Sequence, residues 1–329
     1  MSVAEFVRRL MGDRPALSVM AGVTGVVLND PLPSGLAPRL ATVPCLVLST
    51  VADPLADAVV GAGELEVIAD VAAHSPQALV STALLLRGAA NRTLAESLVA
   101  ESTTYSLLQG GPEFRAWRDS RPTSRTVDPA APGPGVSGPV VVVQRDGDQL
   151  VVELDRPDRR NAYSRLMRDQ VSEALDIAII DDSITRVVLR GRGTNFSSGG
   201  DLDEFGSFNT PVESHLTRLT SSVAWQLATV RDRLGANLVC EVHGANFGAG
   251  VELPAFCGRV VARSDATFCL PEVNLGLTPG AGGTASIPAR IGRQRTALMA
   301  FTAMRLDAST ALEWGLIDAI DDTLDSDVI

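Results

Sequence analysis

Short apolar runs separated by polar, glycine-containing segments characterise the second half of the chain. Strand-length runs occur at Val140–Gln144, Leu150–Leu154, Val187–Arg190, Leu238–Val242, Val260–Ala262 and Thr267–Leu270. The dipeptide Asp146-Gly147, between the first two runs, is typical of a hairpin turn. The pattern therefore predicts a series of short strands that begins with a hairpin.

Helical periodicity fills the spaces between these strands. Ser164 is a good N-cap residue for a helix with one apolar face. That face holds Met167, Val171, Leu175 and Ala178. Further helices are expected over residues 217–230 and from residue 250 onward. Strands that alternate with helices favour an α/β architecture of stacked β-β-α units.

The first part of the chain is predicted to be mostly helical after one strand at Cys45–Ser49. The expected helices cover Asp53–Val60, Glu64–Ala73, Gln77–Arg87 and Thr93–Leu108. On the last of these, Leu94, Leu98 and Glu101 share one face. We therefore expect this helix to pack against another element.

A stretch rich in Pro, Gly and Ser interrupts the pattern at residues 121–138. Such a composition is typical of a linker. We therefore predict a mainly helical segment over residues 1–120, this linker, and a core domain over residues 139–329, which has the usual size of one domain.

Composition narrows the classes of function. The chain of 329 residues is 45% hydrophobic and 20% charged, as expected for a globular protein with a sizeable core. Its formal charge of −11 argues against nucleic acid as the main partner, although a few arginines can still bind an anionic ligand locally. The apolar runs are too short to span a membrane, and the N-terminus lacks the apolar core of a signal peptide, so we expect a cytoplasmic protein.

Metal chemistry is not expected. The four cysteines show no close pairing pattern, and only three histidines are present. The cysteines are Cys45, Cys240, Cys257 and Cys269. We predict buried, reduced thiols and no zinc site. His243, at the end of a strand, is expected to make structural hydrogen bonds rather than to act as a base.

Two glycine-rich segments each carry one glutamate. Val242–Glu252 ends on Glu252, and Leu270–Thr284 holds Glu272 directly after a proline. Two carboxylates that meet at one site form a natural general acid/base pair. Each glutamate also has an ordinary explanation, because Glu252 suits the first turn of a helix and Glu272 suits the cap of a loop. Only the combination favours catalysis.

A third segment, Gly191–Leu202, is a polar, glycine-rich loop between a strand and a helix. The Ser198 amide, together with the Ala249 or Gly250 amide at the next helix start, could face one carbonyl oxygen and stabilise an oxyanion that develops on it. Loss of such a donor costs about 2.7–4 kcal/mol of barrier. A flexible surface loop, and a helix start that needs glycine for packing, are the alternatives.

Three arginines follow the predicted hairpin, namely Arg156, Arg159 and Arg160. The planar guanidinium group suits phosphate binding, although runs of charge usually form only a solvated surface. Both interpretations of this segment stay open on the residues alone.

Together these segments resemble the crotonase (enoyl-CoA hydratase/isomerase) superfamily over residues 139 to about 320. The matching motifs, in the family's order, are Phe196–Asp201, Gly248–Glu252, Pro271-Glu272 with Pro279–Thr284, and Glu313–Asp318. The resemblance implies a crotonase-like core of stacked β-β-α units arranged as a spiral. It also implies a homotrimer or hexamer acting on an acyl-CoA thioester in fatty acid metabolism, with CoA as part of the substrate and no separate cofactor.

The resemblance also implies roles for single residues. The Ser198 and Ala249 amides would hold the thioester oxygen. Glu252 and Glu272 would activate water and protonate the α-carbon. The expected CoA-binding residues are Arg159, Arg160, Ser197, Gly199 and Asp201.

The sequence departs from the family's pattern at both ends. It stops at Ile329, whereas the family continues with three or more helices that close the active site and build the trimer. Residues 55–121 resemble those helices in order and end in Ala116–Arg121, which is similar to the family's A-F-x-x-[KR]-R signature. We therefore hypothesise that the N-terminal helices stand in for the C-terminal ones, as in a circular permutation. An unrelated helical domain is the alternative.

Hydration of a 2-enoyl-CoA is the leading hypothesis, because both glutamate positions are filled. Another reaction on a CoA thioester is the first alternative, either isomerisation or the cofactor-free oxygenation of an arylacetyl-CoA. For the latter, Phe256, Phe268 and Trp225 could line an aromatic pocket. A non-catalytic acyl-CoA-binding subunit is the second alternative.

Overall fold

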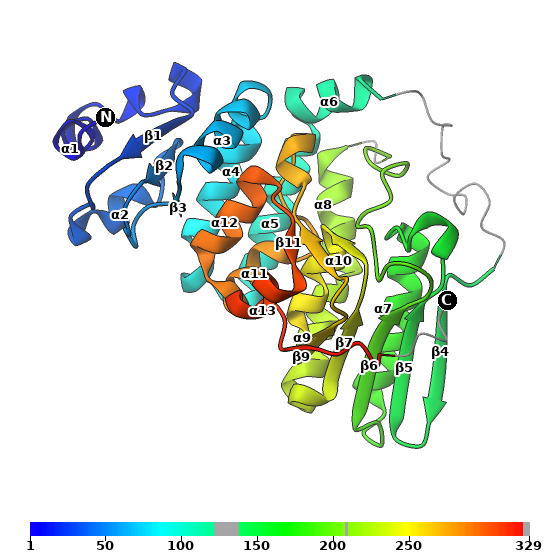
Figure 1. Ribbon diagram of the computed structural model, residues 1–329. Helices are drawn as coiled ribbons and strands as arrows, with labels where there is room; N and C mark the ends of the chain where they lie inside the picture. Colours follow the sequence, from blue (N-terminus) through cyan, green and yellow to red (C-terminus); the bar gives the residue numbers. More distant parts are fainter. Residues whose placement is uncertain (122–137, 208–209, 325–329) are drawn as a thin grey trace.

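The computed structural model describes residues 1–121, 138–207 and 210–324. Figure 1 shows three parts side by side: a small N-terminal layer, a group of helices in the middle, and a large sheet at the far end. The predicted linker over residues 121–138 falls almost entirely outside the described residues.

The large sheet contains β4 (Val141–Asp146), β5 (Gln149–Leu154), β6 (Arg186–Gly191), β7 (Leu238–Val242), β9 (Arg259–Ala262) and β12 (Ala319–Ile320). Within the described residues its order is β12-β9-β7-β6-β5-β4, and only β4 runs antiparallel to its neighbour. The β4–β5 hairpin confirms the prediction. Gly147 adopts φ 58° in its turn, a left-handed conformation that glycine accepts without strain.

A smaller sheet lies beside the large one and contains β8 (Ala245–Phe247), β10 (Thr267–Cys269) and β11 (Leu306–Asp307). The chain passes from one sheet to the other, because β8 follows β7 and β10 follows β9. A helix then follows each pair, namely α10 (Ala249–Glu252) and α11 (Gly283–Ile291). This order confirms the α/β fold class and agrees with the expected stacking of β-β-α units.

The other helices of this half are α7 (Arg165–Ile180), α8 (Pro211–Thr220), α9 (Val223–Leu234), α12 (Arg293–Thr302) and α13 (Ala308–Trp314). Ser164 caps α7 as predicted, since its Oγ accepts the Met167 amide at 3.2 Å. The prediction of a single helix over residues 217–230 is wrong. Ser222 starts a new helix there, because its hydroxyl oxygen accepts the Trp225 amide at 3.3 Å.

The N-terminal layer is an α/β unit rather than a helical one. It holds α1 (Val3–Gly12), α2 (Ala37–Leu40), and the parallel strands β1 (Gly25–Leu28), β2 (Leu46–Ser49) and β3 (Ala58–Val59). The helix predicted over Asp53–Val60 is wrong. The buried Asp53 carboxylate instead accepts the amides of Leu32 and Leu55 at 2.9 and 2.8 Å, which holds this segment in a turn before β3.

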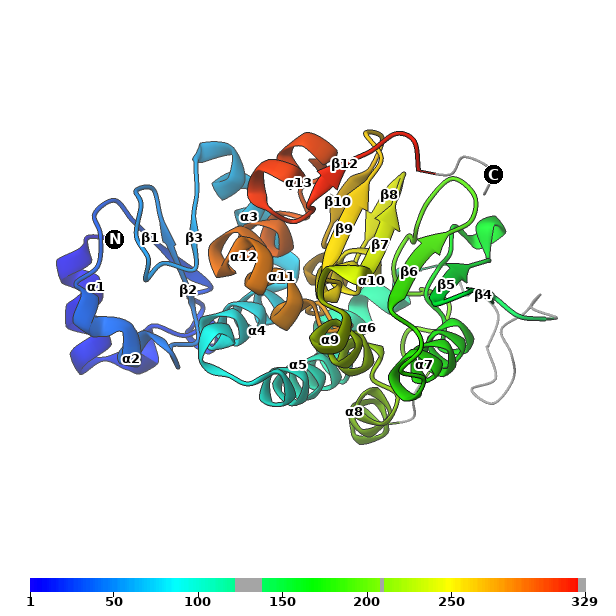
Figure 2. The same ribbon diagram turned by 90° about the horizontal axis from the view of Figure 1, so that it is seen from below.

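The middle helices agree with the prediction. They are α3 (Ala62–His74), α4 (Pro76–Arg87) and α5 (Leu94–Gln109). A further helix that the periodicity did not predict, α6 (Pro112–Asp119), follows them. Thr93 caps α5 and exchanges hydrogen bonds with Glu96, a capping box that explains where this helix begins. Figure 2 shows α5 between α4 and α8, so the expectation that it packs against other elements is confirmed.

Two hydrophobic cores divide the N-terminal half. One core contains buried apolar residues between Phe6 and Val47. The main core includes Leu79 of α4, Leu98 of α5 and Phe114 of α6, together with the sheets and helices of the C-terminal half. The middle helices therefore share their core with the C-terminal half, not with the N-terminal layer alone.

The four cysteines are buried free thiols, as predicted. In the described ranges, no helix is both long enough and apolar enough to cross a membrane.

Candidate active site

A cavity of about 180 Å³ lies where the middle helices meet the glycine-rich segments of the C-terminal half. Its lining brings together the glutamates Glu101, Glu252 and Glu272 with Tyr105, Arg218 and Ala249. The two glutamates predicted to be catalytic thus share one cavity, and the third comes from a helix of the N-terminal half.

Glu252 is the last residue of α10 and is almost fully buried. Its Oε2 accepts hydrogen bonds from the amides of Ala281 and Gly283 at 2.7 and 2.8 Å. These donors favour the ionised carboxylate. Burial opposes them and, together with the neighbouring Glu272 and Glu101 carboxyl groups, raises the pKa of Glu252 well above its usual value.

Glu272 begins a short 3₁₀ turn, Glu272–Leu275, and is buried. Its Oε2 has no hydrogen-bond partner among the described residues. Its Oε1 lies so close to Gly248 that a Cβ at position 248 would be only 2.2 Å from this oxygen. Gly248 also has φ 48°, so both the contact and the backbone conformation require glycine there. Burial raises the pKa of Glu272 to about 8, with a smaller contribution from Glu101.

Glu101 on α5 is the third buried carboxylate. Its Oε1 accepts the Gly282 amide at 2.6 Å, and its Oε2 accepts the amide and hydroxyl of Thr284 at 2.8 and 2.7 Å. Burial raises the pKa of Glu101, and these three donors oppose the rise. The sequence pattern predicted that Glu101 lies on a packing face of its helix, and no function was assigned to it. Its position on an otherwise apolar helix face could have indicated one, because a buried carboxylate needs polar partners.

Tyr105 and Arg218 form the wall next to Glu101. The Arg218 guanidinium lies over the Tyr105 ring, 3.7 Å from its centroid, and donates to the Gly280 carbonyl oxygen at 2.8 Å. Burial raises the pKa of Tyr105 to about 12, so the phenol is neutral. Sequence reasoning missed both residues, because neither belongs to a motif and their contact joins α5 to α8.

The two predicted oxyanion segments meet through their backbones. The Phe247 amide donates to the Ser197 carbonyl oxygen at 3.2 Å, and a Cβ on Gly250 would lie 2.2 Å from that same oxygen. Only glycine therefore fits at position 250. Ala249 is the first residue of α10, where an amide has no acceptor within the helix, and it lines the cavity.

Comparison with known proteins identifies the family of this site. A family model described as enoyl-CoA hydratase/isomerase matches residues 147–326. A curated relative from Escherichia coli, named 2,3-dehydroadipyl-CoA hydratase, is 32% identical over 180 residues, which cover 55% of this chain and 68% of the relative. The chain belongs to the enoyl-CoA hydratase/isomerase family. The motifs over residues 196–284 thus lie within the matched region.

Other family members agree with this assignment. The short-chain-enoyl-CoA hydratase of Clostridium acetobutylicum is 29% identical, over 55% of this chain and 68% of that protein. A solved structure of an enoyl-CoA hydratase subunit from Geobacillus kaustophilus is 30% identical and superposes with a TM-score of 0.51, over 56% of this chain and 70% of that one. The match spans between 57% and 68% of the length of eight curated relatives.

The structure differs from the family-based expectation at Ser198. The Ser198 amide donates to the Arg160 carbonyl oxygen at 2.9 Å, and the residue lies outside the lining of the cavity. Arg160 and Asn161 both adopt left-handed conformations, with φ 53° and 51°. In this structure the Ser198 amide is therefore not free for a thioester oxygen. The sequence could not reveal the bond, because it joins two loops that are distant along the chain.

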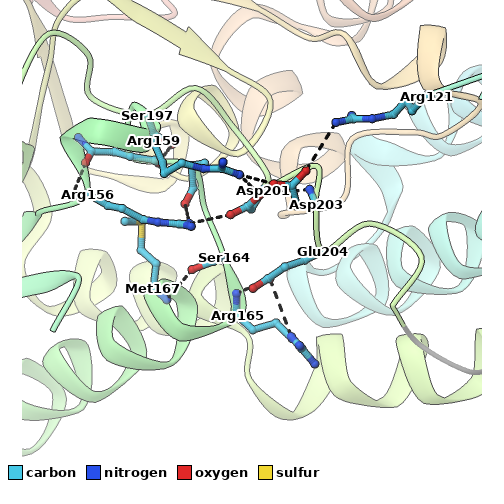
Figure 3. A network of polar contacts seen from close by, with 12 residues as sticks. Arg121, Arg156, Arg159, Ser164, Arg165, Met167, Ser197, Asp201, Asp203 and Glu204 are labelled. Atoms are coloured by element: carbon cyan, nitrogen blue, oxygen red, sulfur yellow. Dashed lines mark hydrogen bonds and ion pairs between the residues drawn. The ribbon is translucent and has the colours of Figure 1, made fainter. Parts of the chain in front are cut away.

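Most residues expected to bind CoA instead take part in internal contacts (Figure 3). Asp201 is buried and accepts hydrogen bonds from Arg156 at 2.7 Å and Arg159 at 3.3 Å. The Ser197 hydroxyl donates to the Asn161 carbonyl oxygen at 2.8 Å. These contacts brace the loop from within, and Asp201 also lines the cavity.

Gly199 and the two arginines complete this group. The Gly199 carbonyl oxygen accepts the Tyr163 amide at 2.8 Å. Arg159 pairs with the carboxylates of Asp203 and Asp201, which raises its pKa. Arg160 is exposed, and its guanidinium has no ion-pair partner within the described residues. Arg160 is thus the member of the set with a free positive charge, and the ligand-binding roles of all five stay predictions.

The aromatic pocket predicted for an arylacetyl group is wrong in its residues. Phe256 and Phe268 are buried in the main core, and Trp225 is 49% exposed; none of them lines the cavity. The His243 Nε2 lies 2.8 Å from the Gly193 carbonyl oxygen, which fits the structural role expected for it. Over the described part of the chain, no cluster of His, Cys, Asp and Glu side chains could hold a metal ion.

Proposed function

We propose that this family member is an enoyl-CoA hydratase that adds water across the double bond of a 2-enoyl-CoA thioester. The observation that carries the proposal is the placement of Glu252 and Glu272 in one cavity that Ala249 also lines. Two buried carboxyl groups that share a site take up one proton between them, which yields an acid and a base.

The hydrogen bonds suggest which carboxyl group plays each part. The Oε2 of Glu252 accepts two backbone amides, whereas the Oε2 of Glu272 has no partner among the described residues. Donors stabilise the charged form and their absence favours the neutral form. We therefore assign Glu252 as the base that orients and deprotonates water, and Glu272 as the acid.

The reaction then follows from these assignments. Water loses a proton to Glu252 as its oxygen bonds to C3 of the enoyl group, and the electron pair of the double bond moves toward the thioester carbonyl. The Ala249 amide stabilises the resulting enolate oxygen. Glu272 gives its proton to C2, which completes the addition of water. Transfer of the water proton from Glu252 to Glu272 restores the starting state.

A second oxyanion donor requires a local change. The Ser198 amide can serve only if the thioester oxygen displaces the Arg160 carbonyl oxygen, to which it donates at 2.9 Å. Exchange of one acceptor for another is close to neutral in energy, whereas a developing negative charge is the better acceptor. The hydrogen bond from the Ser198 amide to the substrate oxygen would then form only as the enolate develops.

The N-terminal helices support the permutation hypothesis. The middle helices share the main core with the matched domain, and α5 brings Glu101 and Tyr105 to the cavity wall. We propose that residues 62–121 occupy the place of the relatives' C-terminal helices. A homotrimer or hexamer is the assembly we propose, and sedimentation equilibrium of the full chain would test it.

Turnover of crotonyl-CoA and longer 2-enoyl-CoAs tests the function. We expect Glu252→Gln and Glu272→Gln each to lower kcat by at least about 10²-fold, the usual contribution of general acid–base catalysis. Glu313→Gln, a substitution at an exposed position in α13, is the matched control and should keep wild-type turnover. Measurable CoA-thioester binding without hydration in the wild-type protein would refute the proposal.

Double-bond isomerisation is the second candidate. It also passes through an enolate, formed by loss of a proton from C2, with a proton that returns to a different carbon, and one curated relative at 33% identity is named enoyl-CoA isomerase/hydratase. Product analysis with a 3-enoyl-CoA separates the two reactions, because an isomerase forms the 2-enoyl thioester without incorporating solvent oxygen.

A further inference from the structure

The segment Ala281–Thr284 divides its backbone amides between two carboxylates. The amides of Ala281 and Gly283 donate to Glu252, whereas those of Gly282 and Thr284 donate to Glu101. Consecutive amides thus point alternately to a residue of α10 and to a residue of α5. The segment is therefore hydrogen-bonded to one carboxylate on each side.

We propose that Glu101 is a positioning residue for the reaction, because it fixes the turn that orients the Glu252 carboxylate. This inference rests on the proposed function of the same cavity. Glu101 does not need to touch the substrate. It acts through the Gly282 and Thr284 amides, which share one rigid turn with the two donors to Glu252.

The chemistry of the contacts supports a fixed geometry. Glu101 is 3% exposed and accepts three hydrogen bonds, one of them from the Thr284 hydroxyl, at 2.6 to 2.8 Å. Hydrogen bonds to a buried carboxylate are shorter and stronger than neutral ones, so the turn has little freedom to shift. A displacement of about 1 Å in a catalytic group can cost roughly 10²-fold in rate.

Glu101 also acts on the site through its charge. It faces Glu252 of α10, Glu272 of the 3₁₀ turn, Arg218 of α8 and Tyr105 of its own helix. The negative charge of Glu101 contributes to the raised pKa of both Glu252 and Glu272. Loss of this charge should therefore lower both pKa values, an effect that a purely structural role would not produce.

Steady-state kinetics of the full-length Glu101→Gln variant are the first test. Gln keeps the shape of the side chain but removes the charge and presents an NH₂ group to the donors of the turn. We expect kcat to fall by about 10²-fold with KM within a few-fold of wild type, and both limbs of the pH–rate profile to move to lower pH. Thr284→Val removes only the hydroxyl donor and should lower kcat by about 2- to 10-fold.

Two controls separate positioning from folding. Glu66→Gln, at an exposed position of α3, should leave kcat and the pH profile unchanged. Carboxyl-carbon NMR titration of Glu252 and Glu272, assigned with the Gln variants, needs no turnover and should show both pKa values lowered in Glu101→Gln.

The possible outcomes distinguish the two proposals. A wild-type protein without hydration overturns the proposed function, and the NMR titration still decides the role of Glu101. An active wild-type protein whose Glu101→Gln variant keeps its kcat, pH profile and Glu252 pKa overturns this inference alone. A folded Glu101→Gln protein with the expected shifts supports it.

Discussion

The two regions of the N-terminal half relate to the rest of the molecule in different ways. The N-terminal layer has a small core of its own between Phe6 and Val47, and it reaches the main core through Leu46 and Leu48 of β2, whereas α3–α6 lie in the main core. Only the second region reaches the cavity, where α5 contributes Glu101 and Tyr105. Both regions precede the matched domain in the sequence, but only the region that shares the main core with that domain contributes residues to the cavity.

The largest expected effect comes from a matched pair of phenylalanines. Phe114 of α6 and Phe6 of α1 are 2% and 0% exposed, but they lie in different cores. Truncation of a buried phenylalanine to alanine costs about 3–5 kcal/mol. We expect Phe114→Ala to lower the free energy of unfolding of the main core by this amount and to reduce turnover.

Phe6→Ala should instead loosen only residues 1–47 and keep turnover near wild type. Chemical denaturation followed by circular dichroism, hydrogen exchange and crotonyl-CoA turnover would measure both variants. Equal loss of activity in the two variants would contradict the division into two regions.

Arg87 connects the two regions and offers the next test. Its guanidinium pairs with Asp57 at 2.6 Å and donates to the carbonyl oxygens of Leu40, Val43 and Cys45. Arg87→Lys keeps the charge but loses the fork of donors, which leaves buried acceptors unpaired at a cost of about 1–3 kcal/mol each.

We expect faster proteolysis of the N-terminal layer in Arg87→Lys, with turnover largely retained. Arg39→Lys, at an exposed position, is the control. Unchanged proteolysis in Arg87→Lys would show that other contacts hold the two regions together.

A pH-dependent stability is expected to mark the cavity region. Burial raises the pKa of Glu272 from 4.5 to about 8. Between these values the folded protein holds a proton on Glu272 that the unfolded chain has lost. The contribution of Glu272 to the free energy of unfolding is therefore fully present below pH 4.5 and is lost as pH rises through about 8. The wild-type Tm should therefore fall over this range relative to that of Glu272→Gln, and parallel Tm curves for the two proteins would contradict the raised pKa.

The smallest effect is expected where the end of α6 meets the loop that contains Asp203. Arg121 lies 3.8 Å from the Asp203 carboxylate, a partly exposed ion pair that Figure 3 also shows. Such pairs contribute about 0–1 kcal/mol and weaken with salt. Arg121→Ala should change stability by less than about 1 kcal/mol in a low-salt thermal melt and by even less at high salt. A larger loss would mean that this contact holds the loop.

Local sequence patterns predicted much of the fold. The hairpin of β4 and β5, the Ser164 cap and the middle helices could be predicted because turn residues, caps and apolar periodicity act over a few positions. The two glutamates could be predicted as well, because their motifs resemble those of the family. The strands β1 and β3 were missed, since strands of four and two residues have too little periodic signal.

The remaining features depend on contacts between distant segments. Glu101 and Thr284 come from opposite halves of the chain, so no local pattern links them. The bond from Ser198 to Arg160 changed the expected oxyanion hole for the same reason. Ser222 was a missed local signal, because the break between α8 and α9 follows from a serine cap that the sequence does contain.

By itself, the sequence determined the α/β class, the family resemblance and the two candidate catalytic carboxylates. Backbone turns, caps and short motifs encode these features over a few residues. Only the tertiary structure decided that α5 completes the cavity wall and that Glu101 and Glu252 share one turn. Burial and hydrogen-bond partners arise when distant segments meet, and they set both the pKa of a carboxyl group and its orientation.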